Sequence, residues 1–167
     1  PGAMVSVVCH NAMNRAVREY KLTQPSLILD KTRDLVVEEF SKSSEDVKDG
    51  MDIALCSLEG NKLQYSGAHN PLWIVRAGEL LETKADKQPI GKFDGAKPFV
   101  NHEVELQKGD SIYIFSDGYV DQFGGERDKK FGSRRLKELL VTIQEKPMIE
   151  QKSFLESSLK FWMNESD

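Results

Sequence analysis

The chain has 167 residues, of which 39% are hydrophobic and 30% are charged, a composition typical of a soluble globular protein with one sizeable core. Its formal net charge of −4 argues against a nucleic-acid partner, because nucleic-acid-binding surfaces usually carry a basic excess. No apolar run approaches the roughly 20 residues that cross a bilayer, and the first residues do not resemble a secretion signal. We therefore expect a cytoplasmic domain without direct membrane insertion, although other domains of a longer protein could tether it to a membrane.

Two helices are expected at the start of the chain. Residues 1–20 place apolar side chains on one helical stripe, made of Val5, Val8, Ala12, Met13 and Ala16. Residues 23–40 repeat this spacing, and Thr23 is expected to cap the second helix ahead of Pro25.

Short strands are expected in the middle of the chain. The segments with strand character are residues 51–59, 62–68, 71–77, 79–85, 99–107 and 111–116. The last of them carries the apolar run from Ile112 to Phe115, which suggests a buried strand. Residues 85–98 hold two prolines and two glycines, so we expect a loop there that adds nothing to the core.

Helices return in residues 133–146 and 148–166, on either side of Pro147. The second of these places Phe154, Leu155, Leu159 and Trp162 on one face. Helices at both ends with strands between them indicate an α+β fold, in which an antiparallel meander is covered by helices. We expect a single domain over residues 1–167.

Two arrangements of nucleophilic residues are weak candidates for a site. Cys9 and Arg15 have the Cys-x5-Arg spacing of tyrosine phosphatases, but the residues between them contain no glycine and lie inside a helical pattern. Cys9 and Cys56 are too few for a disulfide framework, and we expect both to be buried thiols in a reducing compartment. Ser116, His69 and an aspartate could form a hydrolase triad, but no Gly-x-Ser-x-Gly elbow supports it.

Carboxylates at strand ends are the stronger candidates. Asp49 and Asp52 stand where one strand begins, and Asp117 and Asp121 follow the exit of another. Mg²⁺ and Mn²⁺ prefer oxygen ligands, and loops at strand ends can aim several carboxylates at one point. Gly118 would let the chain turn away and free the Asp117 side chain, although Asp-Gly is also ordinary turn chemistry.

A third feature is the sequence Gly-Ala-His-Asn-Pro at residues 67–71. Gly67 interrupts a strand pattern, while His69 and Asn70 supply polar side chains. The segment could be a β-bulge or tight loop, or it could line a pocket with one protonatable and one amide group.

Taken together, several segments resemble one known family, the phosphatase domain of stage II sporulation protein E, a bacterial branch of the metal-dependent (2C-type) serine/threonine protein phosphatases. The similar segments are residues 1–8, 49–80, 87–91, 106–125 and 129–132, in the family's order. The pair of blocks Ala-His-Asn-Pro and Ser-Asp-Gly is fairly specific. The resemblance implies an α-β-β-α sandwich, in which helices flank two antiparallel sheets. It also implies hydrolysis of phosphoserine or phosphothreonine by water activated between two Mn²⁺ or Mg²⁺ ions.

The resemblance also implies roles for individual residues. Asp117 matches a metal ligand, and Asp121 matches an acid that would orient metal-bound water. Gly118 belongs to the same block. Gly67, His69 and Asn70 match a block beside the site and are expected to shape it. Asp49 and Asp52 remain weaker candidates.

The chain departs from the family at both ends. The family has an aspartate followed by Gly-His-Gly directly before the equivalent of Pro1, and a last strand opened by an Asp-Asp pair, and both supply metal ligands. The chain lacks both segments and the family's N-terminal strands; Asp167 could be the leading edge of the last strand. We therefore expect this fragment to bind the ions weakly or not at all and to have little activity alone, whereas its parent would be active.

The expected partner of the parent is a phosphorylated regulatory protein, such as an antagonist of an anti-sigma factor. Two alternatives remain: a non-catalytic module that keeps the phosphatase fold to bind or sense a partner, and an unrelated α+β binding domain. Residues 85–98 and 124–132 are candidates for substrate contact, or else simple solvated turns.

Overall fold

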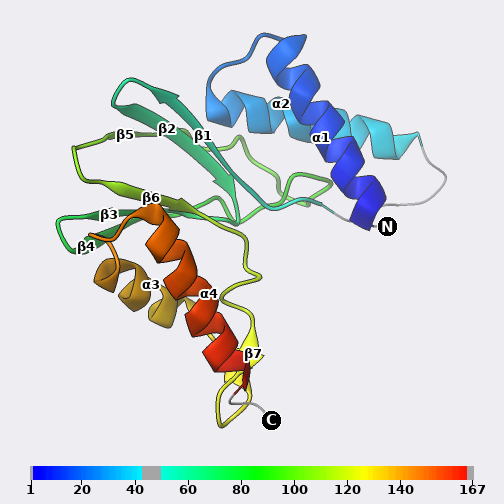
Figure 1. The fold of residues 1–167 in the computed structure, drawn as a ribbon. Coiled ribbons are helices and arrows are strands. Elements are labelled where there is room, and N and C mark those ends of the chain that lie inside the picture. Colours follow the sequence, from blue (N-terminus) through cyan, green and yellow to red (C-terminus); the bar gives the residue numbers. More distant parts are fainter. Residues whose placement is uncertain (1, 43–49, 165–167) are drawn as a thin grey trace. The chain divides into compact units, whose positions relative to one another are not determined.

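A computed structural model describes residues 2–42 and 50–164 of the chain (Figure 1). The elements in order are α1 (Gly2–Arg18), α2 (Pro25–Ser41), β1 (Ile53–Glu59), β2 (Lys62–Ala68), β3 (Leu72–Arg76), β4 (Glu79–Thr83), β5 (His102–Glu105), β6 (Ser111–Ile114), β7 (Phe123–Gly124), β8 (Lys129–Lys130), α3 (Ser133–Thr142) and α4 (Met148–Asn164). Within these described residues, no helix is both long enough and apolar enough to cross a bilayer.

The chain forms two compact units. Unit 1 comprises Pro1–Leu72 and Thr83–Gln107, and unit 2 comprises Trp73–Glu82 and Lys108–Asp167. Each unit has its own sheet and its own hydrophobic core.

In unit 1, α1 and α2 pack against each other, and α2 also contacts β1 and β2 (Figure 1). The apolar stripe of α1 is buried as the sequence predicts, with Val5, Ala12 and Ala16 in the interior. The expected cap of α2 is wrong. Gln24, not Thr23, is the capping residue, and its side chain makes no capping bond. The Ser26 N–H of the first turn donates instead to Asn101 Oδ1, at 3.4 Å, and Pro25 has no N–H that needs a partner.

The sheet of unit 1 has the strand order β1-β2-β5. β1 and β2 form an antiparallel hairpin in which Glu59 pairs with Lys62 at the turn and Ile53 pairs with Ala68 at the open end. β5 then pairs with the other edge of β2, antiparallel, although β3 and β4 come between them in the chain. The predicted meander is therefore wrong in its order, because strand neighbours were assumed to follow one another in sequence.

The sheet of unit 2 has the strand order β4-β3-β6. β3 and β4 are joined by Ala77 and Gly78, whose φ angles of 48° and 82° are both positive. Two positive φ angles are typical of the tight turn that suits the right-handed twist of a hairpin. Asp110, directly before β6, accepts two hydrogen bonds from the Arg76 guanidinium at 2.9 and 2.7 Å, which ties β6 to the end of β3.

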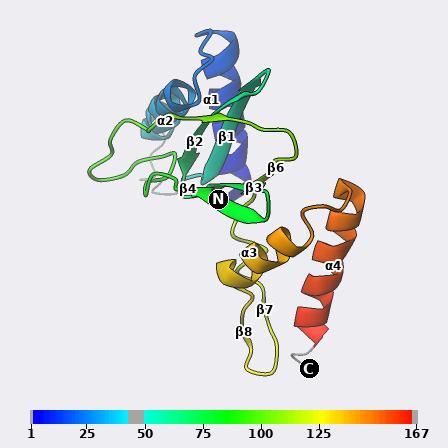
Figure 2. The same cartoon turned by 90° about the vertical axis from the view of Figure 1, so that its left-hand side faces the viewer.

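The helices of unit 2 cover a core built around Trp73, Leu136, Leu140 and Ile143. α3 and α4 lie near each other, and the end of α4 contacts β7 of the small β7–β8 hairpin (Figure 2). Leu155, Leu159 and Trp162 of α4 pack on this core as expected. Phe154 does not, because its ring is 45% exposed and lies under the Lys146 ammonium instead.

The predicted α+β class with antiparallel sheets is confirmed. The prediction for residues 85–98 is confirmed only in part. They form a loop without a regular strand, but Ile90 is fully buried in the core of unit 1 and bridges to Met51. A composition rich in proline and glycine excludes regular structure more reliably than it excludes burial.

Leu29 and Leu27 lie two residues apart on α2 and differ in burial, 0% against 48% exposed. We expect Leu29→Ala to lower the free energy of unfolding by about 2–5 kcal/mol, since it empties a packed core position. Leu27→Ala should cost less than about 1 kcal/mol. Denaturant unfolding of the two variants measures the difference, and equal losses would contradict the assigned core of unit 1.

Candidate functional site

Asp117 lies in unit 2, in a turn that follows β6. Its side chain is exposed, and among the described residues no hydrogen bond or ion pair engages its carboxylate. A carboxylate that follows the end of a strand and has no protein partner is available to a cation or to water. The structure thus leaves Asp117 free for the ligand role that the sequence predicts.

The strand that leads to Asp117 is not buried as expected. Ile112 is 37% exposed and Ile114 is 52% exposed, while Ser111 and Tyr113 turn the other way and are more enclosed. The Tyr113 hydroxyl donates a hydrogen bond to Gln151 Oε1 of α4 at 2.6 Å. A continuous apolar run suggested burial on both faces, but only one face of β6 is packed within unit 2.

Gly118 plays a different part from the one expected. Its φ angle is not in the left-handed region, and a Cβ at this position would meet only Ser116 Oγ, at 3.7 Å. The turn begins instead because the Asp121 N–H donates to the Asp117 carbonyl at 2.8 Å. Gly118 therefore leaves open space beside Asp117, but the backbone does not require it there.

Asp121 has an ionic partner in the structure. Its carboxylate lies 2.7 Å from Lys130 Nζ of β8, with both side chains about half exposed. This ion pair ties the turn after β6 to the β7–β8 hairpin. The predicted role of Asp121 in orienting water stays a prediction, and Lys130 would compete for the same oxygen.

The Gly67–Pro71 block lies in unit 1 and is built around a close approach at Gly67. The Tyr65 hydroxyl donates to the Asn70 carbonyl at 2.7 Å and passes directly over Gly67. A Cβ on Gly67 would overlap this hydroxyl and would lie 2.6 Å from the Asn70 carbonyl oxygen. Burial also raises the pKa of Tyr65, which keeps the hydroxyl protonated and able to donate.

His69 occupies a strained backbone position within this block. Its φ angle is 58°, in the left-handed region that few residues other than glycine adopt. Its N–H donates to the Asp86 carbonyl at 2.9 Å, and the Asp86 N–H donates back to the Gly67 carbonyl at 3.0 Å. Backbone positions of this kind are concentrated at functional sites, and the site-shaping role of the block stays a prediction.

The His69 ring is held by Asp52. His69 Nδ1 lies 2.8 Å from Asp52 Oδ1, and both side chains are nearly half exposed, at 41% and 47%. The structure thus brings together two of the residues that the sequence marked separately. Asp49, the other acid predicted at this strand, lies outside the described residues.

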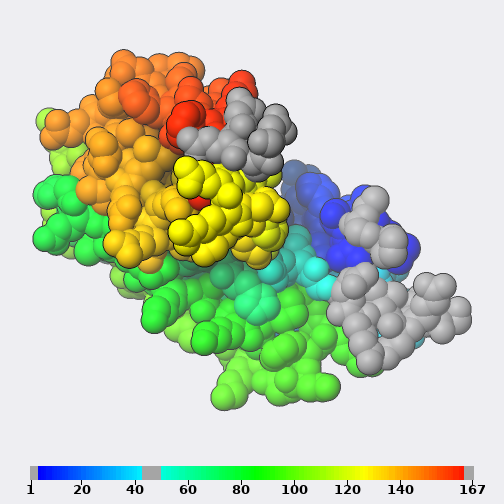
Figure 3. Space-filling view, turned by 90° about the horizontal axis from the view of Figure 1, so that it is seen from below, coloured from blue at the N-terminus to red at the C-terminus, as the bar shows by residue number. Residues whose placement is uncertain are grey.

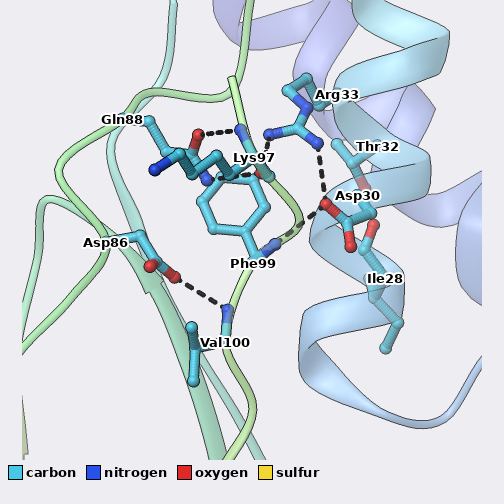
Figure 4. Close-up of polar contacts among 9 residues, drawn as sticks. All are labelled: Ile28, Asp30, Thr32, Arg33, Asp86, Gln88, Lys97, Phe99 and Val100. Carbon is cyan, nitrogen blue, oxygen red and sulfur yellow. Dashed lines mark hydrogen bonds and ion pairs between the residues drawn. The ribbon is translucent and has the colours of Figure 1, made fainter. Parts of the chain in front are cut away.

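The loop of residues 85–98, which the sequence marks as a candidate for substrate contact, also supports this block. The Asp86 carboxylate accepts from the Val100 N–H at 2.9 Å, and the Gln88 side-chain amide bonds both the N–H and the carbonyl of Lys97 (Figure 4). Asp30 of α2 accepts from the Phe99 N–H at 3.1 Å and pairs with Arg33 at 2.9 Å. These contacts join distant parts of the sequence, so no local pattern could have revealed them.

The cysteines are not placed for nucleophilic chemistry. Cys9 is fully buried on α1 within the core of unit 1, and its burial raises the pKa of the thiol. Cys56 is only half-buried, contrary to expectation, and burial raises its pKa as well. A nucleophilic cysteine needs the opposite shift, so the interpretation of Cys9 as a small core residue is confirmed.

No group of three or more histidine, cysteine, aspartate or glutamate side chains converges to hold a metal ion within residues 2–42 and 50–164. Asp117 has the chemistry of a ligand for a hard cation, but one carboxylate is too few for a tight site. The described residues therefore supply one candidate ligand for a metal site and not a complete set of ligands.

The stage II sporulation protein E family model matches residues 1–163. The chain belongs to this family. No curated protein sequence matches it at a significant level. Because the family match covers nearly the whole chain, the resemblance drawn from the Ala-His-Asn-Pro and Ser-Asp-Gly blocks is confirmed.

Solved structures agree with the family assignment. The chain is 29% identical to the SiaA-PP2C domain of Pseudomonas aeruginosa, with a TM-score of 0.87 over 99% of this chain and 65% of that one. It also has the fold of the PP2C phosphatase domain of SpoIIE from Bacillus subtilis, at 12% identity and a TM-score of 0.70 over 98% of this chain and 46% of that one. The RsbU and RsbW domains of Rv1364c from Mycobacterium tuberculosis match at 17% identity and a TM-score of 0.68, over 96% of this chain and 44% of that one. This member of the SpoIIE family therefore has a PP2C phosphatase domain fold and spans less than two thirds of each of these chains.

Gly67 and Gly118 provide a matched pair of substitutions. We expect Gly67→Ala to lower the free energy of unfolding by about 1–3 kcal/mol, since the new methyl overlaps the Tyr65 hydroxyl and forces the Asn70 turn to shift. Gly118→Ala should change it by no more than about 0.5 kcal/mol, because the space is open and φ is unstrained. Thermal and denaturant unfolding of both variants provide the test, and a reversed order of costs would contradict the described packing.

Thiol labelling tests the placement of the cysteines. We expect iodoacetamide at pH 7.5 to modify Cys9 at least about tenfold more slowly than a free peptide thiol, because a raised pKa and complete burial both limit the thiolate. Full denaturant should remove the difference. Rapid modification of Cys9 in the native chain, followed by mass spectrometry, would instead show a reactive thiol.

Proposed function

We propose that this domain belongs to a metal-dependent serine/threonine protein phosphatase that removes phosphate from a regulatory phosphoprotein. The main support is the family match across residues 1–163 together with the PP2C phosphatase domain fold. The exposed and unpaired carboxylate of Asp117, within the Ser-Asp-Gly block of that family, is the local feature that agrees with it.

Divalent cations, Mn²⁺ or Mg²⁺, would supply Lewis-acid activation of water and neutralise charge on the phosphoryl oxygens when bound. Asp117 would contribute one oxygen ligand to such a site. The turn that carries it is fixed by the Asp121 N–H at one end and by the Asp121–Lys130 ion pair at the other. A ligand held on a fixed turn pays little conformational entropy when it binds an ion.

His69 would provide an oriented polar side chain at the site and would not act as the nucleophile. Asp52 fixes one ring nitrogen at 2.8 Å, so the other is left to face solvent or substrate. The left-handed backbone of His69 and the tight packing over Gly67 would hold that orientation. That Gly67, His69 and Asn70 shape the active site is proposed from the family block alone.

The substrate is proposed from the family and not from the geometry. Its members include the B. subtilis cell fate determinant SpoIIE, and the solved relatives include an RsbU domain joined to an RsbW domain. A phosphorylated regulatory protein such as an anti-sigma factor antagonist is consistent with these relatives. The alternative is a non-catalytic module that keeps the same fold to bind or sense a partner.

Asp117→Asn in the intact parent protein tests the proposal. The substitution keeps size and shape but removes the charge, so we expect Mn²⁺-dependent hydrolysis of p-nitrophenyl phosphate to fall about a hundredfold or more. Asp94→Asn, an exposed acid in the loop of unit 1, should leave the rate unchanged. Full activity of Asp117→Asn would sink the metal-ligand role, and an inactive parent would favour the non-catalytic module.

The same assay applies to the 167-residue chain alone. Since Asp117 has no convergent partner carboxylates in the described part, we expect weak Mn²⁺ binding by calorimetry and little turnover. Metal-dependent turnover at a rate similar to the parent's would show that a complete site is present.

A further inference from the structure

Basic residues are concentrated in one segment of unit 2. Six of the 23 lysines and arginines of the chain lie within residues 127–137, although the chain as a whole has a net charge of −4. The six are Arg127, Lys129, Lys130, Arg134, Arg135 and Lys137. The same stretch holds a single acid, Asp128. An acidic protein therefore carries a local basic surface.

Three of the six cations are neutralised by carboxylates. Lys130 pairs with Asp121 at 2.7 Å, Arg134 with Glu138 at 3.0 Å and Lys137 with Glu82 at 2.9 Å. The other three have no acidic partner among the described residues. They are Arg127, Lys129 and Arg135, and all three line one pocket.

The pocket lies between the β7–β8 hairpin and the end of α4, wholly within unit 2, and has a volume of about 390 Å³. Gly124, Gly125, Glu126 and Trp162 complete its lining. Glu126 is the one acid there, so the three cations outnumber it. Figure 3 shows the hairpin segment, in yellow, standing at the surface, where a partner can reach it.

Two hydrogen bonds and a close contact at glycine fix one wall of the pocket against α4. The Gly125 N–H donates to the Trp162 carbonyl at 2.9 Å, and the indole N–H of Trp162 donates to the Gln122 carbonyl at 3.2 Å. A Cβ on Gly125 would lie 2.8 Å from the Trp162 ring, so the hairpin can approach α4 this closely only with glycine. Packing within unit 2 therefore fixes this wall, which lowers the entropic cost of binding.

Arg135 is oriented by two contacts that leave its charge uncompensated. Its guanidinium lies over the Trp162 ring, 4.4 Å from the centroid, and one N–H donates to the Phe131 carbonyl at 2.9 Å. A guanidinium held flat against an aromatic ring can still offer its remaining N–H groups to a carboxylate. Since Arg135 covers the indole, that face of Trp162 is not available for stacking on a nucleic-acid base.

We propose that this pocket binds an acidic peptide segment of the protein substrate, through carboxylates that pair with Arg127, Lys129 and Arg135. The volume exceeds that of a single oxyanion many times over, because one water occupies only about 30 Å³ of liquid. The charge complements an acidic chain, and such pairing steers a partner and selects it more than it adds raw affinity. Identifying the acidic segment as part of the substrate rests on the proposed phosphatase function, whereas its binding to the pocket does not.

A charge-reversed variant tests the binding directly. The probe is a fluorescein-labelled decapeptide of glutamate, titrated with the intact protein at low salt in EDTA and followed by anisotropy. We expect saturable binding that weakens with added salt, and Arg127→Glu/Lys129→Glu should weaken it at least about tenfold. Both residues are exposed, so their replacement should leave unfolding unchanged.

The control carries the same change in net charge elsewhere on unit 2. Lys108→Glu/Lys160→Glu replaces two exposed lysines that do not line the pocket, and we expect it to stay within about twofold of wild type. Equal losses in the two double variants would overturn the proposal, since only overall charge would then matter. Absence of peptide binding, or binding of phosphatidylserine vesicles in place of the peptide, would overturn it too.

The enzymatic arm separates this proposal from the proposed function. With a phosphoserine peptide flanked by glutamates, Arg127→Glu/Lys129→Glu in the intact parent should raise KM about tenfold and leave kcat and p-nitrophenyl phosphate hydrolysis unchanged. Unchanged KM in an active parent contradicts the substrate role. A parent without phosphatase activity contradicts the proposed function but leaves the peptide-binding result to decide on the pocket.

Discussion

The close approach of Tyr65 to the backbone at Gly67 is the constraint on which the candidate site of unit 1 depends. The tyrosine hydroxyl reaches the Asn70 carbonyl only because nothing projects from Gly67. That bond closes a turn tight enough to force His69 into the left-handed region. In this conformation His69 reaches Asp52. The polar pair at the surface therefore depends on the lack of a side chain at Gly67.

The segment from Asp86 to Val100 provides the second layer of support. It has no regular strand, yet Asp86, Gln88 and Asp30 hold its backbone N–H and carbonyl groups through side chains. Buried or half-buried backbone groups need such partners when no neighbouring strand supplies them. Side chains therefore supply the hydrogen bonds to this backbone that a neighbouring strand supplies in a sheet.

The sequence was sufficient for the elements whose signal is local. Each of these signals lies within a short stretch of the sequence. They are the periodicity of α1 and α4, the β1–β2 hairpin and the family blocks. It failed where the deciding contact is distant: β5 pairs with β2 across two intervening strands, and Ile90 is buried from within a loop rich in proline and glycine. At the candidate site, the sequence marks Gly67, where the structure shows a close contact, and Asp117, whose ligand role stays a prediction. The sequence does not predict the ion pair of Asp121, the ordinary φ of Gly118 or the pocket beside Trp162, because each depends on contacts between residues that are not neighbours in a local pattern.

The chain path through the two units has a consequence for any attempt to divide the protein. The β3–β4 hairpin leaves unit 1 after Leu72 and returns to it at Thr83, although its residues Trp73 and Val75 belong to the core of unit 2. A single break after Gln107 would strand this hairpin with the wrong partner and leave α3 and α4 without the side chains that they cover. Neither unit is a continuous stretch of the chain, so we expect that cutting after Gln107 yields neither unit in its folded form. During synthesis, β3 and β4 are made before the residues of α3 and α4 that share their core.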